Sequence, residues 1–196
     1  MNDNNSIATW FKNATNNPSL MHRLKTISLI IADIDGSLTD GRVECRADGE
    51  GTRYFSTQDG YGTKRAMEAG IAIAFVSGKG SGSGLNRARI LAIPEKFCVL
   101  GSEDKRIAVK QLQLRENISE ENTLIFGDDI LDAQVKIDQP TSFFACPNNS
   151  PFYIQALGDL VIPRDGGQHA FRLLLDLLLY ARGQHQLQTT IASLVA

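Results

Sequence analysis

Five aspartates directly follow two apolar runs of the sequence. Asp33 and Asp35 follow the first run, and Asp128, Asp129 and Asp132 follow the second. Because side chains alternate along an extended chain, we expect Asp33 and Asp35 to leave their strand on the same side. Two carboxylates about 4 Å apart repel by roughly 4 kcal/mol at an effective dielectric of about 20. A group of these aspartates therefore predicts a bound cation or shifted protonation.

Magnesium suits these residues best, because it prefers oxygen ligands and commonly joins one or two carboxylates to a substrate phosphate. No cluster of His or Cys lies nearby in the sequence, which argues against zinc. On a phosphate ester, we expect Asp33 to be the nucleophile and Asp35 the acid and base. We predict that Asp33, Asp35 and Asp128 bind Mg²⁺ and that Asp129 and Asp132 support the site.

Further groups that suit a phosphate follow other apolar runs. Ser77, Gly78 and Lys79 come after one such run, and Lys105 opens a helical segment. We expect Ser77 and neighbouring backbone N–H groups to hydrogen-bond the phosphate oxygens, with Gly36, Gly78 and Lys79 also at the substrate. Lys105 is the predicted catalytic cation, because a fixed positive charge offsets the negative charge that develops on the phosphate oxygens.

The elements that must position these groups alternate along the chain. Short apolar runs bounded by Gly, Asp or Pro predict buried strands at 27–32, 71–76, 97–100, 123–126, 143–146 and 160–162. Helices are predicted at 61–69, 85–91, 105–116, 131–137, 151–157 and 168–181. This alternation predicts an α/β domain with a Rossmann-like parallel sheet and helices on both faces, and ligands then bind at the carboxyl ends of the strands. Turn residues at 48–51 predict a projecting β-hairpin at about 42–56.

Composition limits the classes of protein to consider. A chain of 196 residues suits one domain, which we place at 26–183, with a helical extension at 1–25 and a tail at 184–196. A net charge of -2 offers no overall field for nucleic acid or an anionic membrane. Three widely spaced cysteines and an amino terminus without signal-peptide blocks favour the cytoplasm.

The order of these motifs resembles a known superfamily. Asp-x-Asp-Gly, Ser-Gly after a second strand, Lys, and Gly-Asp-Asp-x-x-Asp occur together in phosphohydrolases of the haloacid dehalogenase superfamily. The segments 35–41, 59–62 and Gly166-Gly167 more closely resemble the capless 3-deoxy-D-manno-octulosonate 8-phosphate phosphatases and their nonulosonate 9-phosphate relatives. This resemblance implies magnesium dependence and a homotetramer in which the hairpins pack together and a neighbouring subunit helps to close each active site.

Three positions depart from the pattern of those phosphatases. Where close relatives usually carry arginine, this chain has Gln58, Lys79 and Gln168, and His169 follows the last of these. An arginine binds a sugar carboxylate through a planar two-point contact that glutamine cannot reproduce. The sequence therefore indicates the reaction class more firmly than the sugar.

The leading hypothesis is a magnesium-dependent phosphomonoesterase that acts on a small phosphorylated sugar or sugar acid. A signalling receiver domain also uses an aspartate, a hydroxyl, a lysine and magnesium, but an acid–base at Asp35 would shorten the life of its aspartyl-phosphate. A catalytically silent or regulatory homologue is the third alternative, because of the substituted basic positions.

Overall fold

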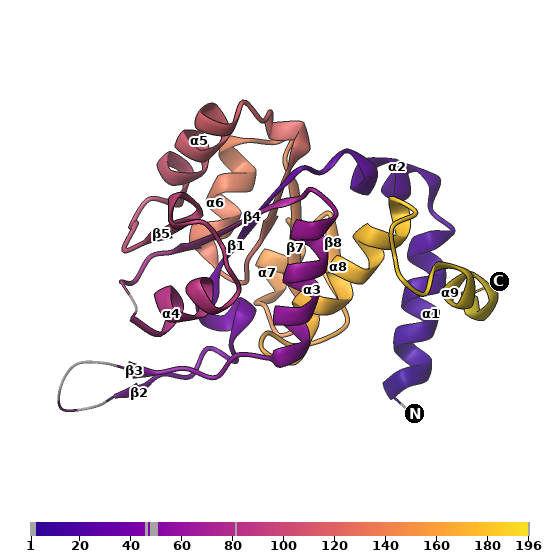
Figure 1. The fold of residues 1–196 in the computed structure, drawn as a ribbon, viewed down its shortest axis with the longest axis horizontal. Helices are drawn as coiled ribbons and strands as arrows, with labels where there is room; N and C mark the ends of the chain where they lie inside the picture. The colour runs from indigo at the N-terminus through magenta and orange to yellow at the C-terminus, as the bar shows by residue number, and fades with distance from the viewer. Residues whose placement is uncertain (1–2, 46, 48–50, 81, 196) are drawn as a thin grey trace.

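The centre of the fold is a parallel β-sheet (Figure 1). The structure, a computed structural model, describes residues 3–45, 47, 51–80 and 82–195. The strands of the sheet are β1 (Leu29–Ala32), β4 (Ala72–Ser77), β5 (Cys98–Leu100), β6 (Thr123–Phe126), β7 (Phe143–Pro147) and β8 (Leu160–Ile162). They lie in the order β5-β4-β1-β6-β7-β8, and every neighbouring pair is parallel. This arrangement confirms the α/β fold predicted from the alternation of apolar and amphipathic segments.

Strand β1 lies between β4 and β6, and this position brings three motifs to one edge of the sheet. Ala32 at the end of β1 is paired with Phe75 on one side and Phe126 on the other. All four residues of β1 are buried, as expected for a strand covered on both faces. Asp33 and the residues that follow β4 and β6 therefore emerge side by side at the carboxyl ends of the strands.

Helices cover both faces of the sheet, as predicted. They are α3 (Thr57–Glu68), α4 (Gly82–Ile90), α5 (Lys105–Glu116), α6 (Ile130–Asp138), α7 (Phe152–Gln155) and α8 (Ala170–Ala181). Short 3₁₀ turns, η2 (Glu95–Phe97) and η3 (Glu120–Asn122), precede β5 and β6. Figure 1 shows α5 and α6 on one face and α3 and α8 on the other. Helix α3 begins earlier than predicted, because the Ser56 hydroxyl accepts a hydrogen bond from Asp59 N–H and caps the helix.

The two ends of the chain pack together beside α8. Helices α1 (Asp3–Thr15) and α2 (Pro18–Thr26) precede the sheet, and α9 (Gln188–Val195) follows α8. Helix α1 contacts α2, α8 and α9, and the indole N–H of Trp10 donates a 3.1 Å hydrogen bond to the carbonyl oxygen of Val161. The amino-terminal extension is thus helical and docked on the domain, and the predicted tail contains a helix of its own.

The predicted hairpin projects from the body of the molecule (Figure 1). Its strands, β2 (Glu44–Cys45) and β3 (Gly51–Thr52), are antiparallel and lie within the predicted range of 42–56. Residue 46 and the turn residues 48–50 lie outside the described residues, as does Ser81 in the glycine-rich segment after β4. Within the described part of the chain, no helix combines the length and apolar character that crossing a bilayer requires.

Candidate active site

A tight loop after β1 begins the site. Asp33 has extended backbone, and the chain then enters the wide helical turn η1 (Ile34–Leu38). Gly36 in this turn has φ +96°, which favours glycine, and a Cβ there would lie 2.1 Å from the Asp128 Oδ2 atom. Glycine at this position therefore lets the loop after β1 approach the loop after β6.

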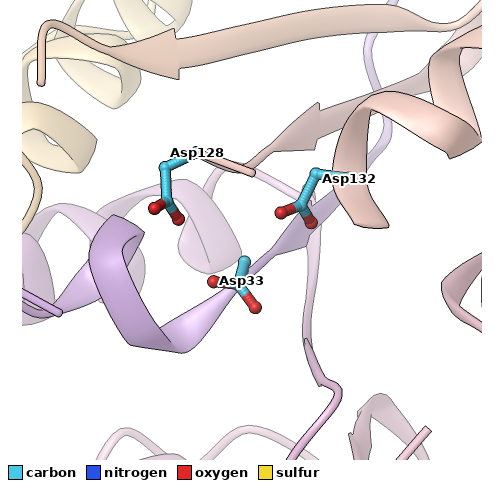
Figure 2. Close-up of side chains that lie close together, drawn as sticks. All are labelled: Asp33, Asp128 and Asp132. Atoms are coloured by element: carbon cyan, nitrogen blue, oxygen red, sulfur yellow. The ribbon is translucent and has the colours of Figure 1, made fainter. Parts of the chain in front are cut away.

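Three carboxylates meet at this edge of the sheet (Figure 2). Asp33 follows β1, Asp128 follows β6, and Asp132 lies in the first turn of α6. Each residue offers one oxygen, and these oxygens all lie within 4.8 Å of one another. Asp33 and Asp132 are almost completely buried. This group contains three of the predicted aspartates, drawn from segments almost a hundred residues apart.

Lys105 joins two of these carboxylates. It is the first residue of α5, its side chain is 3% exposed, and Nζ lies 2.5 Å from Asp33 Oδ1 and 2.8 Å from Asp132 Oδ1. The Asp128 carboxylate has a different partner, since Ser37 Oγ donates a 2.8 Å hydrogen bond to its Oδ1 atom. One lysine cannot neutralise three ionised carboxylates, so the group then carries a net negative charge.

Burial shifts the protonation of this cluster. It raises the pKa of Asp33 to about 7, with a contribution from Asp132, although Lys105 acts in the opposite direction. Burial and the charge of Asp33 raise the pKa of Asp128 to about 6, and burial also raises the pKa of Asp132. Burial alone would lower the pKa of Lys105, but the two aspartates more than offset it and raise that pKa.

The cluster suits a small divalent cation. Carboxylate oxygens are hard ligands, and a cation beside Asp33 and Asp128 would stabilise their charged forms, which burial and mutual repulsion now disfavour. Asp132 is already paired with Lys105. The residues present therefore fit Mg²⁺ held chiefly by Asp33 and Asp128.

The Asp35 side chain lies apart from this cluster. Its oxygens accept hydrogen bonds from Arg53 Nε at 2.5 Å and Arg53 Nη2 at 2.9 Å. The expectation that Asp33 and Asp35 leave the strand on the same side is corrected here, because alternation ends where the chain turns into η1 at Ile34. Among the described residues, the three-carboxylate group contains Asp132 in place of Asp35.

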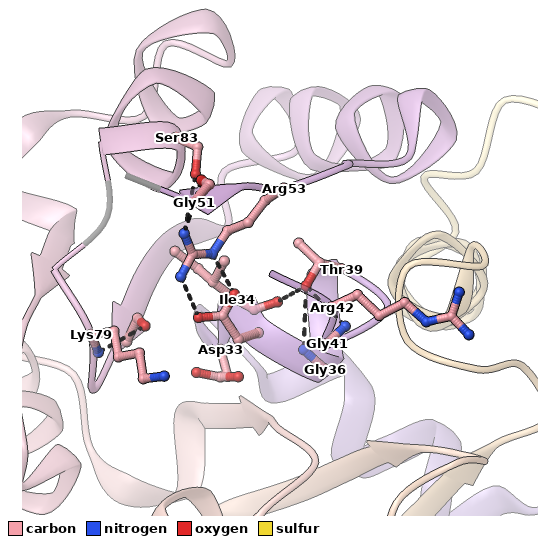
Figure 3. A network of polar contacts seen from close by, with 12 residues as sticks. Asp33, Ile34, Gly36, Thr39, Gly41, Arg42, Gly51, Arg53, Lys79 and Ser83 are labelled. Carbon is pink, nitrogen blue, oxygen red and sulfur yellow. Dashed lines mark hydrogen bonds and ion pairs between the residues drawn. The ribbon is translucent and has the colours of Figure 1, made fainter. Parts of the chain in front are cut away.

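The Ser77 segment lines the same edge. Ser77 ends β4 and is buried, and its hydroxyl accepts a 3.3 Å hydrogen bond from the N–H of Lys79. A Cβ on Gly78 would lie 3.3 Å from Leu131 Cδ1, so this segment passes close to the start of α6. The Lys79 residue is exposed, and Figure 3 draws it in one view with Asp33 and the hairpin.

Asp129 lies outside the cluster and has a local function. Its Oδ1 atom accepts a 2.7 Å hydrogen bond from the N–H of Ile130, so it caps α6. Its neighbour in the motif, Asp132, instead contacts Lys105. Of the two residues predicted to support the site, Asp129 thus caps α6 and Asp132 belongs to the carboxylate group.

The substituted positions lie on separate segments: Gln58 in the first turn of α3, Lys79 after β4, and Gln168 just before α8. Gln58 and Gln168 are exposed, and His169 Nδ1 lies 2.8 Å from Ser56 Oγ. His169 has φ +70°, an uncommon conformation for a residue with a side chain. Its contact with Ser56 ties the start of α8 to the start of α3.

Sequence reasoning missed Ser37 and Arg53. Ser37 is adjacent to Gly36 in a motif already singled out, so its polar side chain in that motif was a usable signal. Arg53 carries no local signal, because its partner is 18 positions earlier and is reached only where the chain leaving the hairpin passes η1.

The parallel sheet, the aspartate after its central strand, the buried lysine and the acidic loop after β6 define a phosphohydrolase of the haloacid dehalogenase class. No family model matches the sequence. A 3-deoxy-D-manno-octulosonate 8-phosphate phosphatase from Haemophilus influenzae is 34% identical over 165 residues, which cover 84% of this chain and 89% of the relative. The chain therefore belongs to the 3-deoxy-D-manno-octulosonate 8-phosphate phosphatase family.

Solved structures support the same relationship. A cobalt-bound deoxy-D-mannose-octulosonate 8-phosphate phosphatase from Haemophilus influenzae matches with a TM-score of 0.79 and 32% identity, covering 84% of this chain and 94% of that chain. The phosphatase from Moraxella catarrhalis, in complex with magnesium, phosphate and KDO, matches with a TM-score of 0.79 and 27% identity. That match covers 89% of this chain and 97% of the other.

Proposed function

We propose that this protein is a magnesium-dependent phosphomonoesterase that hydrolyses 3-deoxy-D-manno-octulosonate 8-phosphate or a closely similar sugar-acid phosphate. Family membership supports the reaction and the substrate class. The single observation that carries the proposal is the contact of Lys105 with both Asp33 and Asp132. A carboxylate oxygen of Asp128 lies within 4.8 Å of an oxygen of each of these two aspartates. A buried carboxylate with a fixed cation and room for a divalent ion is what an aspartyl-phosphate mechanism requires.

The proposed first step is attack by Asp33 on the phosphorus atom. A bond forms from a carboxylate oxygen to phosphorus, the ester bond breaks, and Asp35 donates a proton to the leaving alkoxide. Lys105 favours the charged form of Asp33 and holds its orientation. The Ser77 hydroxyl and nearby backbone N–H groups would bind the phosphoryl oxygens.

In the proposed second step, Asp35 removes a proton from water, which attacks the aspartyl-phosphate and releases phosphate from Asp33. A magnesium ion held by Asp33 and Asp128 would supply positive charge to the phosphoryl oxygens. The hydrogen bond from Ser37 fixes the orientation of Asp128 for that contact. Asp132 supports both steps by keeping Lys105 in place.

The assembly and location of the protein belong to the proposal as well. The hairpin projects from the domain and so leaves its surface available to a neighbouring subunit. We therefore propose the homotetramer that the family resemblance implies, acting in the cytoplasm on a small phosphate ester.

Magnesium-supported phosphate release from the sugar-acid phosphate tests the proposal. The wild-type protein should release phosphate, and chelation of the metal should stop it. Asp33→Asn should abolish release and leave the fold intact, whereas Asp138→Asn, at an exposed position on α6, should retain it. Equal activity of Asp33→Asn and the wild type would contradict the proposal, and an inactive wild type would favour the silent homologue.

A further inference from the structure

Arg53 connects the hairpin to the catalytic loop. Its guanidinium contacts both Asp35 oxygens, and Nη1 lies 3.5 Å from both Gly51 O and Ser83 Oγ. Figure 3 shows this guanidinium between Ser83 and the loop that contains Ile34. The Arg53 side chain is 6% exposed, against 23% for Asp35. Three separate segments therefore meet at one buried arginine.

The contact with Arg53 occupies the Asp35 carboxylate, which the proposed reaction needs as its acid and base. An acid–base must direct an oxygen at the leaving group and then at water. Both Asp35 oxygens are instead bound by Arg53. The two-point contact must therefore open or pivot before Asp35 can act.

A substrate oxyanion can take the place of Asp35 on this arginine. Carboxylate and phosphate groups both match the planar fork of a guanidinium. The partial exposure of Asp35 gives such a group access to the contact from the solvent side. An incoming anion would keep the buried charge of Arg53 paired, so the exchange leaves no unpaired guanidinium.

Two other arginines in the described residues are less suited to this task. The Arg42 side chain is 91% exposed, and Arg87 donates a 2.7 Å hydrogen bond to Ser56 O. Gln58 and Gln168 carry no charge. Arg53 is the guanidinium that already holds a carboxylate of the catalytic loop, that of Asp35.

We propose that Arg53 positions Asp35 and determines substrate specificity. In the free enzyme it holds the Asp35 carboxylate, and in the complex it binds the carboxylate of a sugar-acid phosphate and so releases Asp35. This inference rests on the proposed function, and it assigns to Arg53 the carboxylate contact that glutamine cannot make at positions 58 and 168.

Kinetics on two substrates test this assignment. The first is 3-deoxy-D-manno-octulosonate 8-phosphate, and the second is 4-nitrophenyl phosphate, which has the phosphoryl group but no carboxylate. In Arg53→Gln, the ratio of kcat/KM for the sugar acid to kcat/KM for the aryl phosphate should fall about tenfold or more. Most of the loss should lie in KM for the sugar acid, while kcat for the aryl phosphate should not fall, because Arg53→Gln leaves Asp35 free of its partner.

Two further variants separate this role from a structural one. Arg53→Lys keeps the charge without the two-point fork, so its ratio should fall between those of wild type and Arg53→Gln. Arg42→Gln removes a charge from the same hairpin at an exposed position, and its ratio should match wild type. Equal losses on both substrates in Arg53→Gln would overturn the assignment, because they would indicate a phosphoryl contact or a general structural effect. An unchanged ratio would overturn it as well.

The outcome for Asp33→Asn distinguishes this inference from the proposed function. If Asp33→Asn is inactive on both substrates and the ratio in Arg53→Gln is unchanged, only the role of Arg53 is wrong. If Asp33→Asn remains active, the proposed function is wrong and the role of Arg53 falls with it.

Discussion

Gly166 packs directly against the backbone of Gly36. A Cβ on Gly166 would lie 1.7 Å from the carbonyl oxygen of Gly36 and 3.0 Å from that of Thr39. Gly167, with φ +71°, donates its N–H to Ser37 O at 3.1 Å. The segment before α8 therefore packs against the catalytic loop. The close approach of the two backbones explains why glycines occupy positions 166 and 167.

Gly166→Ala should damage both stability and activity. The added methyl group must displace the backbone of η1, and overpacking of this kind costs about 3 kcal/mol. Urea unfolding should show that loss, and phosphate release should fall with it. Gly80→Ala is the matched control for stability, because a Cβ there has nothing within 4 Å. Full stability of Gly166→Ala would mean that the close contact is not maintained in solution.

Lys105→Met should lower turnover by about a thousandfold, because it removes the fixed cation beside the nucleophile. It also leaves Asp33 and Asp132 buried without their partner, which should cost roughly 3–5 kcal/mol in the metal-free protein. Added magnesium should restore part of that stability by supplying positive charge. Phosphate release and urea unfolding with and without magnesium measure these effects.

Lys110→Met is the control for the lysine substitution, since Lys110 lies on the same helix but is exposed. Its stability and turnover should stay close to those of the wild type. A similar loss in both variants would show that the charge of α5 as a whole, and not the contact with Asp33, is responsible.

Asp59 should make stability depend on pH. It is buried, its Oδ1 atom accepts a 2.7 Å hydrogen bond from Arg172 N–H, and its Oδ2 atom has no partner in the described structure. Burial raises the pKa of Asp59 from its usual 3.8 to about 6. The folded state therefore holds this proton more tightly than the unfolded state, so its contribution to stability is lost as pH rises from about 4 to about 6.

Urea unfolding of the wild type and Asp59→Asn at several pH values tests this contribution. Relative to Asp59→Asn, the wild type should lose about 3 kcal/mol between about pH 4 and pH 7, because each pKa unit corresponds to 1.36 kcal/mol. Asp138→Asn, at an exposed position, should follow the wild type. Parallel curves for the wild type and Asp59→Asn would exclude the shifted pKa.

The sheet and the meeting of distant motifs could be predicted from the sequence for one physical reason. Parallel strands buried on both faces appear as short apolar runs, and their carboxyl ends share an edge. That rule predicts the meeting of five residues at this edge of the sheet: Asp33, Asp128, Asp132, Ser77 and Lys105. The rule does not extend past the end of a strand, which is why the predicted direction of the Asp35 side chain was wrong.

The contacts of the hairpin were beyond prediction for a different reason. The pairing of Arg53 with Asp35 depends on how the chain leaving the hairpin passes η1, and no local pattern encodes that geometry. The early start of α3 depends on the Ser56 cap, and the sequence pattern places Ser56 at the end of the predicted hairpin instead. The contacts of Arg53 and Ser56 therefore become apparent only in the folded structure.

Trapping of the covalent intermediate tests the central claim most directly. The protein is mixed with magnesium and sugar-acid phosphate that carries a radiolabelled phosphoryl group, quenched in acid within one turnover, and mapped by mass spectrometry. Label on the peptide that contains Asp33, dependent on magnesium and absent from Asp33→Asn and Asp128→Asn, is the predicted result. Release of phosphate at the normal rate with no label on Asp33 would contradict the account.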